Sequence, residues 1–157
     1  MSGFAEAGQK MPDIAMETPD GGSVKPSDFK GQKLVIFFYP KDNTPGCTTE
    51  AKDFSTLKAE FDKAGVALLG VSKDSPKKHL NFIAKHDLTT PLATDAEDGG
   101  LSDELGVWTE KKMYGKTFMG MVRSTYLVDA NGVIAKAWNK VKVKGHADEV
   151  LAAAQAI

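Results

Sequence analysis

The sequence has one cysteine among its 157 residues, and this scarcity excludes several kinds of protein. A single thiol cannot form an internal disulfide, so the fold does not depend on an oxidising compartment. No run of residues is apolar over the length needed to cross a bilayer, and the first ten residues lack the apolar centre of a signal peptide. We therefore expect a soluble, cytoplasmic protein that does not act on membranes.

The sequence also lacks an excess of charge, because 20 basic and 21 acidic residues leave a net charge of −1. No nucleic acid or other partner of extreme charge is indicated. The alternation of lysine with valine over residues 140–144 is more typical of the solvated face of a strand than of a nucleic-acid patch. The three histidines, His79, His86 and His146, show no metal-ligand spacing with one another or with Cys47. We expect neither a metal nor a cofactor.

Residues 34–51 organise the chain. The run Leu34–Tyr39 is apolar, β-branched or aromatic, which predicts a central strand covered on both faces. Pro40 ends this strand, and a helical pattern begins at about Cys47 and continues to Gly65. Cys47 therefore lies in the first turn of a helix, where unpaired N–H groups and the helix dipole favour the thiolate. A lone cysteine is often only a small buried hydrophobe, but its position after a Thr-Pro-Gly loop indicates a reactive thiol.

The rest of the chain alternates strand and helix patterns within a single domain spanning residues 1–157. After a loose lead-in over residues 1–11, we expect a hairpin over 14–25, a strand over 66–72, a helix over 76–86, a short strand over 91–94, a short helix over 101–105, a long loop over 106–120, a hairpin over 121–138 around Asn131-Gly132, and a helix over 146–157. Strand, helix and strand over residues 34–72 form a parallel crossover. This order predicts an α/β sandwich with a central mixed β-sheet flanked by helices and an N-terminal β-hairpin.

Several segments resemble one protein family. The spacing Pro40-x-x-x-Thr44-x-x-Cys47 resembles the active-site signature of peroxiredoxins, and residues 44–50 are similar to their bacterioferritin-comigratory-protein, or peroxiredoxin Q, branch. Segments 112–116, 123–127 and 138–147 are similar to that branch in the same order. The resemblance implies a thioredoxin-like fold and a thiol-dependent peroxidase. It implies that hydrogen peroxide and organic hydroperoxides are reduced through a sulfenic acid on Cys47.

The chemistry of peroxide reduction suits two further residues. A thiolate must attack one oxygen while fixed donors stabilise the charge that develops on the departing oxygen. Thr44 offers a hydroxyl three residues before the sulfur, and Arg123 offers a permanently charged planar fork. Arg123 is the single arginine, and the resemblance places an arginine there. The alternative is an arginine that pairs with a surface carboxylate.

Three residues beside the thiol receive supporting roles. The resemblance implies that Pro40 shields the sulfur from bulk water, and Gly46 allows a close approach of the backbone to whatever binds there. Glu50 either hydrogen-bonds to the loop or to Arg123, or is an ordinary acid in the first turn of the helix. The sequence leaves both interpretations of Glu50 open.

One departure from the family pattern decides how the thiol is recycled. Peroxiredoxin Q proteins commonly carry a resolving cysteine five residues after the first or about one helix later, and these positions hold Lys52 and Ile83 here. We therefore expect a one-cysteine cycle that uses an external thiol from thioredoxin, from glutaredoxin with glutathione, or from a small molecule. A monomer is expected, with a weak dimer as the alternative.

Two other functions compete with the peroxidase. A thiol–disulfide oxidoreductase on the same fold would need a Cys-x-x-Cys pair, but Glu50 occupies the position of the second cysteine. A non-catalytic binding module on a thioredoxin-like scaffold would not need Thr44, Cys47 and Arg123 together.

Overall fold

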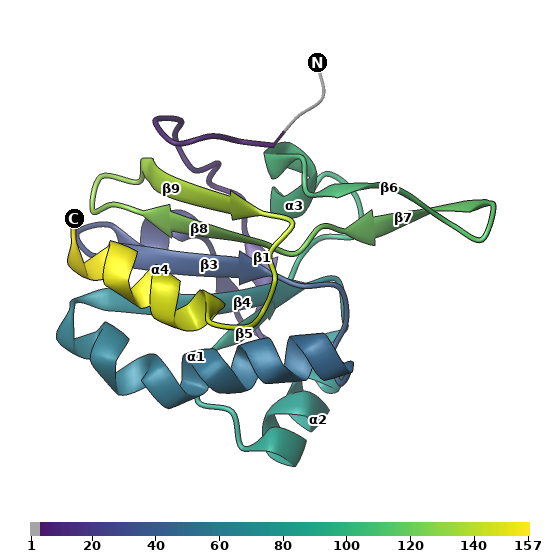
Figure 1. Ribbon diagram of the computed structural model, residues 1–157, viewed down its shortest axis with the longest axis horizontal. Coiled ribbons are helices and arrows are strands. Elements are labelled where there is room, and N and C mark those ends of the chain that lie inside the picture. Colours follow the sequence, from purple (N-terminus) through teal and green to yellow (C-terminus); the bar gives the residue numbers. More distant parts are fainter. Residues whose placement is uncertain (1–3) are drawn as a thin grey trace.

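Strand β3 (Lys33–Phe38) is an interior strand of a seven-stranded mixed sheet in the computed structural model, which describes residues 4–157 (Figure 1). The strand order is β2-β1-β5-β4-β3-β8-β9. β3 pairs in parallel with β4 and antiparallel with β8, while β4 also pairs in parallel with β5. The parallel crossover, the N-terminal hairpin, the hairpin around Asn131-Gly132 and the mixed sheet expected from the sequence are all present.

The other elements follow the expected order. The strands are β1 (Met16–Glu17), β2 (Ser23–Val24), β4 (Val66–Ser72), β5 (Leu92–Thr94), β8 (Ser124–Val128) and β9 (Ile134–Asn139), and the helices are α1 (Pro45–Lys63), α2 (Pro76–His86), α3 (Leu101–Leu105) and α4 (His146–Gln155), with a 3-10 turn at Pro26–Phe29.

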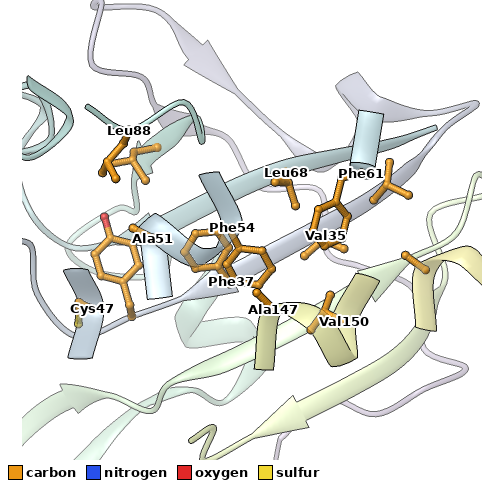
Figure 2. Close-up of a cluster of buried hydrophobic side chains, with 14 of the residues drawn as sticks. Val35, Phe37, Cys47, Ala51, Phe54, Phe61, Leu68, Leu88, Ala147 and Val150 are labelled. Atoms are coloured by element: carbon orange, nitrogen blue, oxygen red, sulfur yellow. The ribbon is translucent and has the colours of Figure 1, made fainter. Parts of the chain in front are cut away.

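β3 is apolar throughout because both of its faces are covered. Val35 and Phe37 belong to a buried cluster that α1, α2 and α4 complete, shown in Figure 2. Leu34, Ile36 and Phe38 point to the opposite face, where they pack in a second cluster with α3 and the N-terminal segment. Successive side chains of a strand alternate between faces, so a continuous apolar run predicts burial on both.

Helix α1 begins at Pro45, two residues before the expected start. Proline is well tolerated in the first turn, because its missing N–H would have no partner in the helix there. The buried face of α1 includes Ala51, Phe54 and Phe61. The ring of Phe54 stacks on that of Phe37, with the ring centroids 4.4 Å apart. The earlier start leaves Cys47 in the first turn, as expected.

The prediction of a long loop over residues 106–120 is wrong. These residues form a separate two-stranded hairpin, β6 (Trp108–Met113) and β7 (Lys116–Met121), which projects from the body (Figure 1). Its turn, Tyr114-Gly115, has positive φ at both residues, 53° and 75°, as a tight hairpin turn requires. Much of the hairpin is exposed, so its sequence lacks the apolar alternation by which a half-buried strand is recognised. The strand expected to start at residue 121 begins at Ser124 instead.

The lead-in also differs from the loose segment expected. Residues 1–3 lie outside the described residues, but the backbone N–H of Ala5 donates to Leu105 at 3.0 Å and that of Met11 to Gly132 at 2.9 Å. The Met11 side chain is buried in the second cluster. These contacts involve single residues and leave no periodic pattern in the sequence. Within residues 4–157, no helix has the length and hydropathy needed to span a bilayer.

Candidate active site

Cys47 is the third residue of α1 and lies at one end of the buried cluster of that face (Figure 2). Only 2% of its surface is exposed. Burial of this degree would also suit a purely structural cysteine. The polar groups around the sulfur therefore distinguish a reactive cysteine from a structural one.

The guanidinium of Arg123 joins Cys47 to Glu50. Its Nη2 donates to Cys47 Sγ at 3.2 Å, and its Nη1 donates to Glu50 Oε1 at 2.7 Å. Glu50 lies about one turn after Cys47 on α1, with 1% of its side chain exposed, and the Arg123 side chain is 17% exposed. The planar fork thus spans two groups on one helix. Of the two interpretations of Glu50, the contact with Arg123 is the one present.

Burial and charge act against each other in this pair. Burial raises the pKa of Glu50 to about 7, although Arg123 opposes the shift. Burial by itself would lower the pKa of Arg123, but Glu50 and Cys47 outweigh it and the net pKa is raised. Arg123 therefore stays charged beside the sulfur.

The main chain around Arg123 is fixed on both sides. Arg123 connects β7 to β8, its carbonyl accepts the N–H of Val141 at 2.9 Å, and the N–H of Val122 donates to Val107 at 2.7 Å. Because β8 pairs with β3, and β3 leads into α1, the arginine is carried to the first turn of that helix.

Gly46 leaves room for the guanidinium. A Cβ built at this position would lie 3.2 Å from Arg123 Nη2, which is closer than such contacts normally come. The close approach expected at Gly46 is therefore that of the arginine side chain.

Thr44 and Pro40 lie in the loop before α1. Thr44 occupies the N-cap position, and its hydroxyl donates to the carbonyl of Lys41 at 2.8 Å. Pro40 follows β3 and is exposed. The structure thus brings Cys47, Gly46, Glu50 and Arg123 into contact, and places Thr44 three residues before the sulfur with its hydroxyl turned to its own loop.

Sequence reasoning missed Lys111, a second cation near the site. Its side chain lies over Gly120, and its Nζ donates to the carbonyl of Met121 at 2.5 Å. Burial and the charge of Arg123 lower the pKa of Lys111. Recognition of the β6–β7 hairpin would have placed this lysine near the arginine, since Lys111 is on β6 and Arg123 follows β7.

The histidines take different surroundings. His146 is buried behind the site, with its Nε2 2.8 Å from Thr125 Oγ1. Burial lowers the pKa of His146 to about 4, with Glu149 opposing the shift and Arg123 adding to it. His79 is fully buried beside Asp42, and His86 Nε2 lies 3.2 Å from Asn43 Oδ1.

Glu50→Gln is expected to change how stability depends on pH. Between pH 4.5 and about 7 an unfolded chain ionises Glu50 while the native state keeps it protonated, so stability falls as pH rises, by roughly 3 kcal/mol over the window at about 1.4 kcal/mol per pH unit. His146, with a native pKa of about 4, has the opposite effect, because stability rises with pH up to its unfolded value of 6.5. The two slopes offset each other in the parent. Removal of Glu50 should leave a variant whose stability rises with pH.

The measurement is the free energy of unfolding in urea at pH 4.5 and pH 7.5 for the parent, Glu50→Gln and His146→Gln. We expect the histidine variant to show the opposite trend, with stability that falls as pH rises. Parallel curves for the parent and Glu50→Gln would contradict the raised pKa of Glu50.

A groove lies beside the first turn of α1. It has a volume of about 620 Å³ and is lined by Pro45 and Gly46 on one side and by residues 143–145 and Asp148 on the other. Burial and the charge of Asp148 raise the pKa of Asp53, which also lines this groove. The groove gives solvent an approach to the backbone that carries Cys47.

Comparisons with known proteins identify the family of the chain. Residues 7–137 match the model of the AhpC/TSA family. The chain is 55% identical over 126 residues to peroxiredoxin Bcp of Xanthomonas campestris, covering 80% of this chain and 78% of that protein. It is 47% identical over 146 residues to peroxiredoxin Bcp of Bacillus subtilis, covering 93% and 92%.

Solved structures confirm the thioredoxin-like peroxiredoxin fold. Peroxiredoxin Q of Xanthomonas campestris superposes with a TM-score of 0.89 at 47% identity, covering 96% of this chain and 97% of that one. A further structure, of the bacterioferritin comigratory protein of the same organism, has the same score and identity and was described for alkyl peroxide reduction with a trapped intermediate. The chain therefore belongs to the AhpC/TSA family, as a peroxiredoxin of the Bcp, or peroxiredoxin Q, branch.

Proposed function

We propose that Cys47 is the nucleophile with which this thiol-dependent peroxidase reduces hydrogen peroxide and organic hydroperoxides. The observation that carries the assignment is the 3.2 Å contact from Arg123 Nη2 to Cys47 Sγ, with the other end of the guanidinium held on buried Glu50. A structural cysteine needs no buried cation, whose desolvation is costly. A thiolate nucleophile gains from one.

The first half-reaction consumes the peroxide. The Cys47 thiolate attacks one peroxide oxygen, an S–O bond forms, and the O–O bond breaks as the second oxygen leaves with the electron pair. This oxygen takes up a proton and departs as water or an alcohol, leaving Cys47 as a sulfenic acid. The guanidinium is positioned to donate to the sulfur and, as charge moves, to the departing oxygen.

Thr44 and Pro40 have supporting roles in this proposal. Thr44 lies at the N-cap of α1, and its hydroxyl would leave the carbonyl of Lys41 to donate to a bound peroxide. Pro40 has no N–H and would keep bulk water from the mouth of the site. Gly46 keeps the space that the arginine needs.

The second half-reaction requires an external thiol. Cys47 is the only cysteine of the chain, so no internal thiol can react with its sulfenic acid. The positions where relatives of this branch commonly place a resolving cysteine hold exposed Lys52 and partly buried Ile83. An incoming thiol would displace water from the sulfenic acid to give a mixed disulfide, and a second thiol would release that disulfide and restore Cys47. Because Cys47 is only 2% exposed, the first turn of α1 must open before a thiol reaches its sulfur. This burial supports small thiols over thioredoxin or glutaredoxin.

The proposal includes a monomeric state and a cytoplasmic location. The lone buried cysteine supports a reducing compartment, since the fold uses no disulfide. Light scattering and cell fractionation test these two points. The oxidoreductase alternative gains no support, because the position of its second thiol holds Glu50, buried against Arg123.

Addition of one equivalent of hydrogen peroxide is expected to add one oxygen atom to the protein within seconds, as read by intact-mass measurement. A sulfenic-acid reagent should trap the product, and its reduction should speed up in proportion to an added small thiol. Protein whose Cys47 has been blocked with N-ethylmaleimide is the control. An unchanged mass after peroxide treatment would refute the assignment of Cys47.

A further inference from the structure

A buried polar cluster outside the thiol site links three segments of the fold. Tyr39, the residue that follows β3, donates its hydroxyl to Asp42 Oδ1 at 2.6 Å. His79 Nδ1, from α2, lies 2.7 Å from Asp42 Oδ2 and 3.4 Å from the Tyr39 hydroxyl. His79 Nε2 lies 3.0 Å from the carbonyl of Ala93 on β5. His79 and Tyr39 are at most 1% exposed, and Asp42 is 7% exposed.

The polar atoms of this cluster face one another. A carbonyl only accepts, so His79 Nε2 must carry a hydrogen to bond Ala93. Nδ1 lies close to Asp42 Oδ2 and to the Tyr39 hydroxyl, whose own hydrogen is directed to Asp42 Oδ1. Burial beside Asp42 raises the pKa of Tyr39 far enough that it remains a neutral donor. The cluster therefore links the end of β3, the Asp42 loop, α2 and β5 through buried polar side chains.

Asp42 belongs to the loop that leads into the reacting sulfur. Its backbone N–H donates to Asp74 Oδ2 at 2.8 Å, and Asp74 in turn accepts the hydroxyl of Ser72 at 2.6 Å. The next residue, Asn43, has a positive φ of 62°, a conformation that costs a non-glycine residue energy, and its side chain contacts His86 of α2. Thr44 and the start of α1 follow directly.

Burial of polar side chains is costly unless they are paired, and an apolar cluster of the same volume would serve packing as well. A hydrogen-bonded polar cluster has one advantage over apolar packing, which is that hydrogen bonds are directional. It fixes the path of the chain from β3 to α1 at Asp42, five residues before Cys47, where the backbone is in a costly conformation.

We infer that the Tyr39–Asp42–His79 cluster is a positioning device for the peroxide reaction, which fixes loop 40–44 against α2 and so sets the location of Thr44 and Cys47. The inference rests on the proposed peroxidase role of Cys47. The three residues do not touch the sulfur. They act through the loop, and His79 does so from a helix that contributes no reacting group.

The test compares two reactions of Cys47 that depend on the loop in opposite ways. Reduction of hydrogen peroxide needs the Thr44 hydroxyl and the Cys47 sulfur at fixed positions relative to each other. A misplacement of about 1 Å can lower a rate by about 100-fold. Iodoacetamide is bulkier than hydrogen peroxide, and its reaction with Cys47 is limited by the 2% exposure of that residue. For His79→Gln and Asp42→Asn we expect the peroxide rate to fall by about 10- to 100-fold while alkylation becomes faster.

Controls separate positioning from stability. Ser102→Ala, on α3, removes a buried hydroxyl that donates to Asp95 and contacts none of the three cluster residues, so it should lower the melting temperature and change neither rate. Tyr39→Phe removes one hydroxyl and keeps the ring, and it replaces any of the other variants that fails to fold. The His79→Gln, Asp42→Asn double variant should lose no more peroxide rate than the worse single variant, because the two residues act as one unit.

The outcomes are distinct. If the folded variants keep the peroxide rate of the parent, or if both reactions slow together in step with the melting temperature, the cluster is only structural and the inference fails. If the parent itself does not react with peroxide, the proposed function fails instead. Amide hydrogen exchange of residues 41–47 gives a readout without peroxide, and faster exchange in Tyr39→Phe is the expected result.

Discussion

Replacement of Cys47 by serine is expected to reduce peroxide turnover to the rate of buffer alone. The reaction needs a nucleophile that is both charged and polarisable, and a serine hydroxyl beside Arg123 remains protonated at neutral pH. No second thiol exists in the chain that could take over the attack. The measurement is peroxide consumption with an excess of a small thiol as reductant.

Serine at this position also changes the core, so the variant needs a matched control. The side chain is almost fully buried in the cluster of Figure 2, where a hydroxyl costs about 1–3 kcal/mol unless it finds a partner. Cys47→Ala avoids the buried hydroxyl and should be equally inactive. Circular dichroism should show the parent fold in both. Turnover that survives in either folded variant would exclude Cys47 as the nucleophile.

Arg123→Lys is expected to lower the second-order rate constant for peroxide by about 10- to 100-fold, that is by about 1.4 to 2.7 kcal/mol of transition-state stabilisation. The charge is kept, but one ammonium cannot repeat two donors 3.2 Å from the sulfur and 2.7 Å from Glu50 in a fixed plane. A lysine drawn to buried Glu50 would leave the sulfur without its donor. Stopped-flow measurement under single-turnover conditions isolates this step.

Glu50→Gln is the matched control for the arginine. The amide oxygen still accepts from Nη1, so Arg123 keeps its place, and the peroxide rate should fall far less than in Arg123→Lys. Gly46→Ala perturbs the same guanidinium from the other side, since the added Cβ would lie 3.2 Å from Nη2. An unchanged rate in Arg123→Lys would show that Arg123 serves the fold alone.

Local sequence determined the elements that carry the thiol. The run Leu34–Tyr39 is apolar at every position, so only a strand buried on both faces accommodates it. Apolar residues at steps of three and four then form α1, and Pro45 suits its first turn. Cys47 could be placed at a helix N-terminus because these signals act between residues close in the chain.

Local sequence failed where an element gains little from the core. The hairpin β6–β7 has a turn of Tyr114-Gly115 in place of the Asn-Gly pair that identifies such turns, and both of its strands are largely exposed. The lead-in up to Met11 likewise has no pattern of its own. It is held by backbone hydrogen bonds to the turn before β9 and to α3.

The sequence by itself therefore determined which residue types were available for peroxide chemistry and which elements present them. Only the tertiary structure decided which of them meet. Arg123 reaches Cys47 across 76 residues because β8 pairs with β3, and His79 reaches Asp42 across 37 because α2 packs beside the loop. Contacts between such distant residues depend on sheet order and helix packing, which many sequences share, and no spacing along the chain encodes their distances or burial.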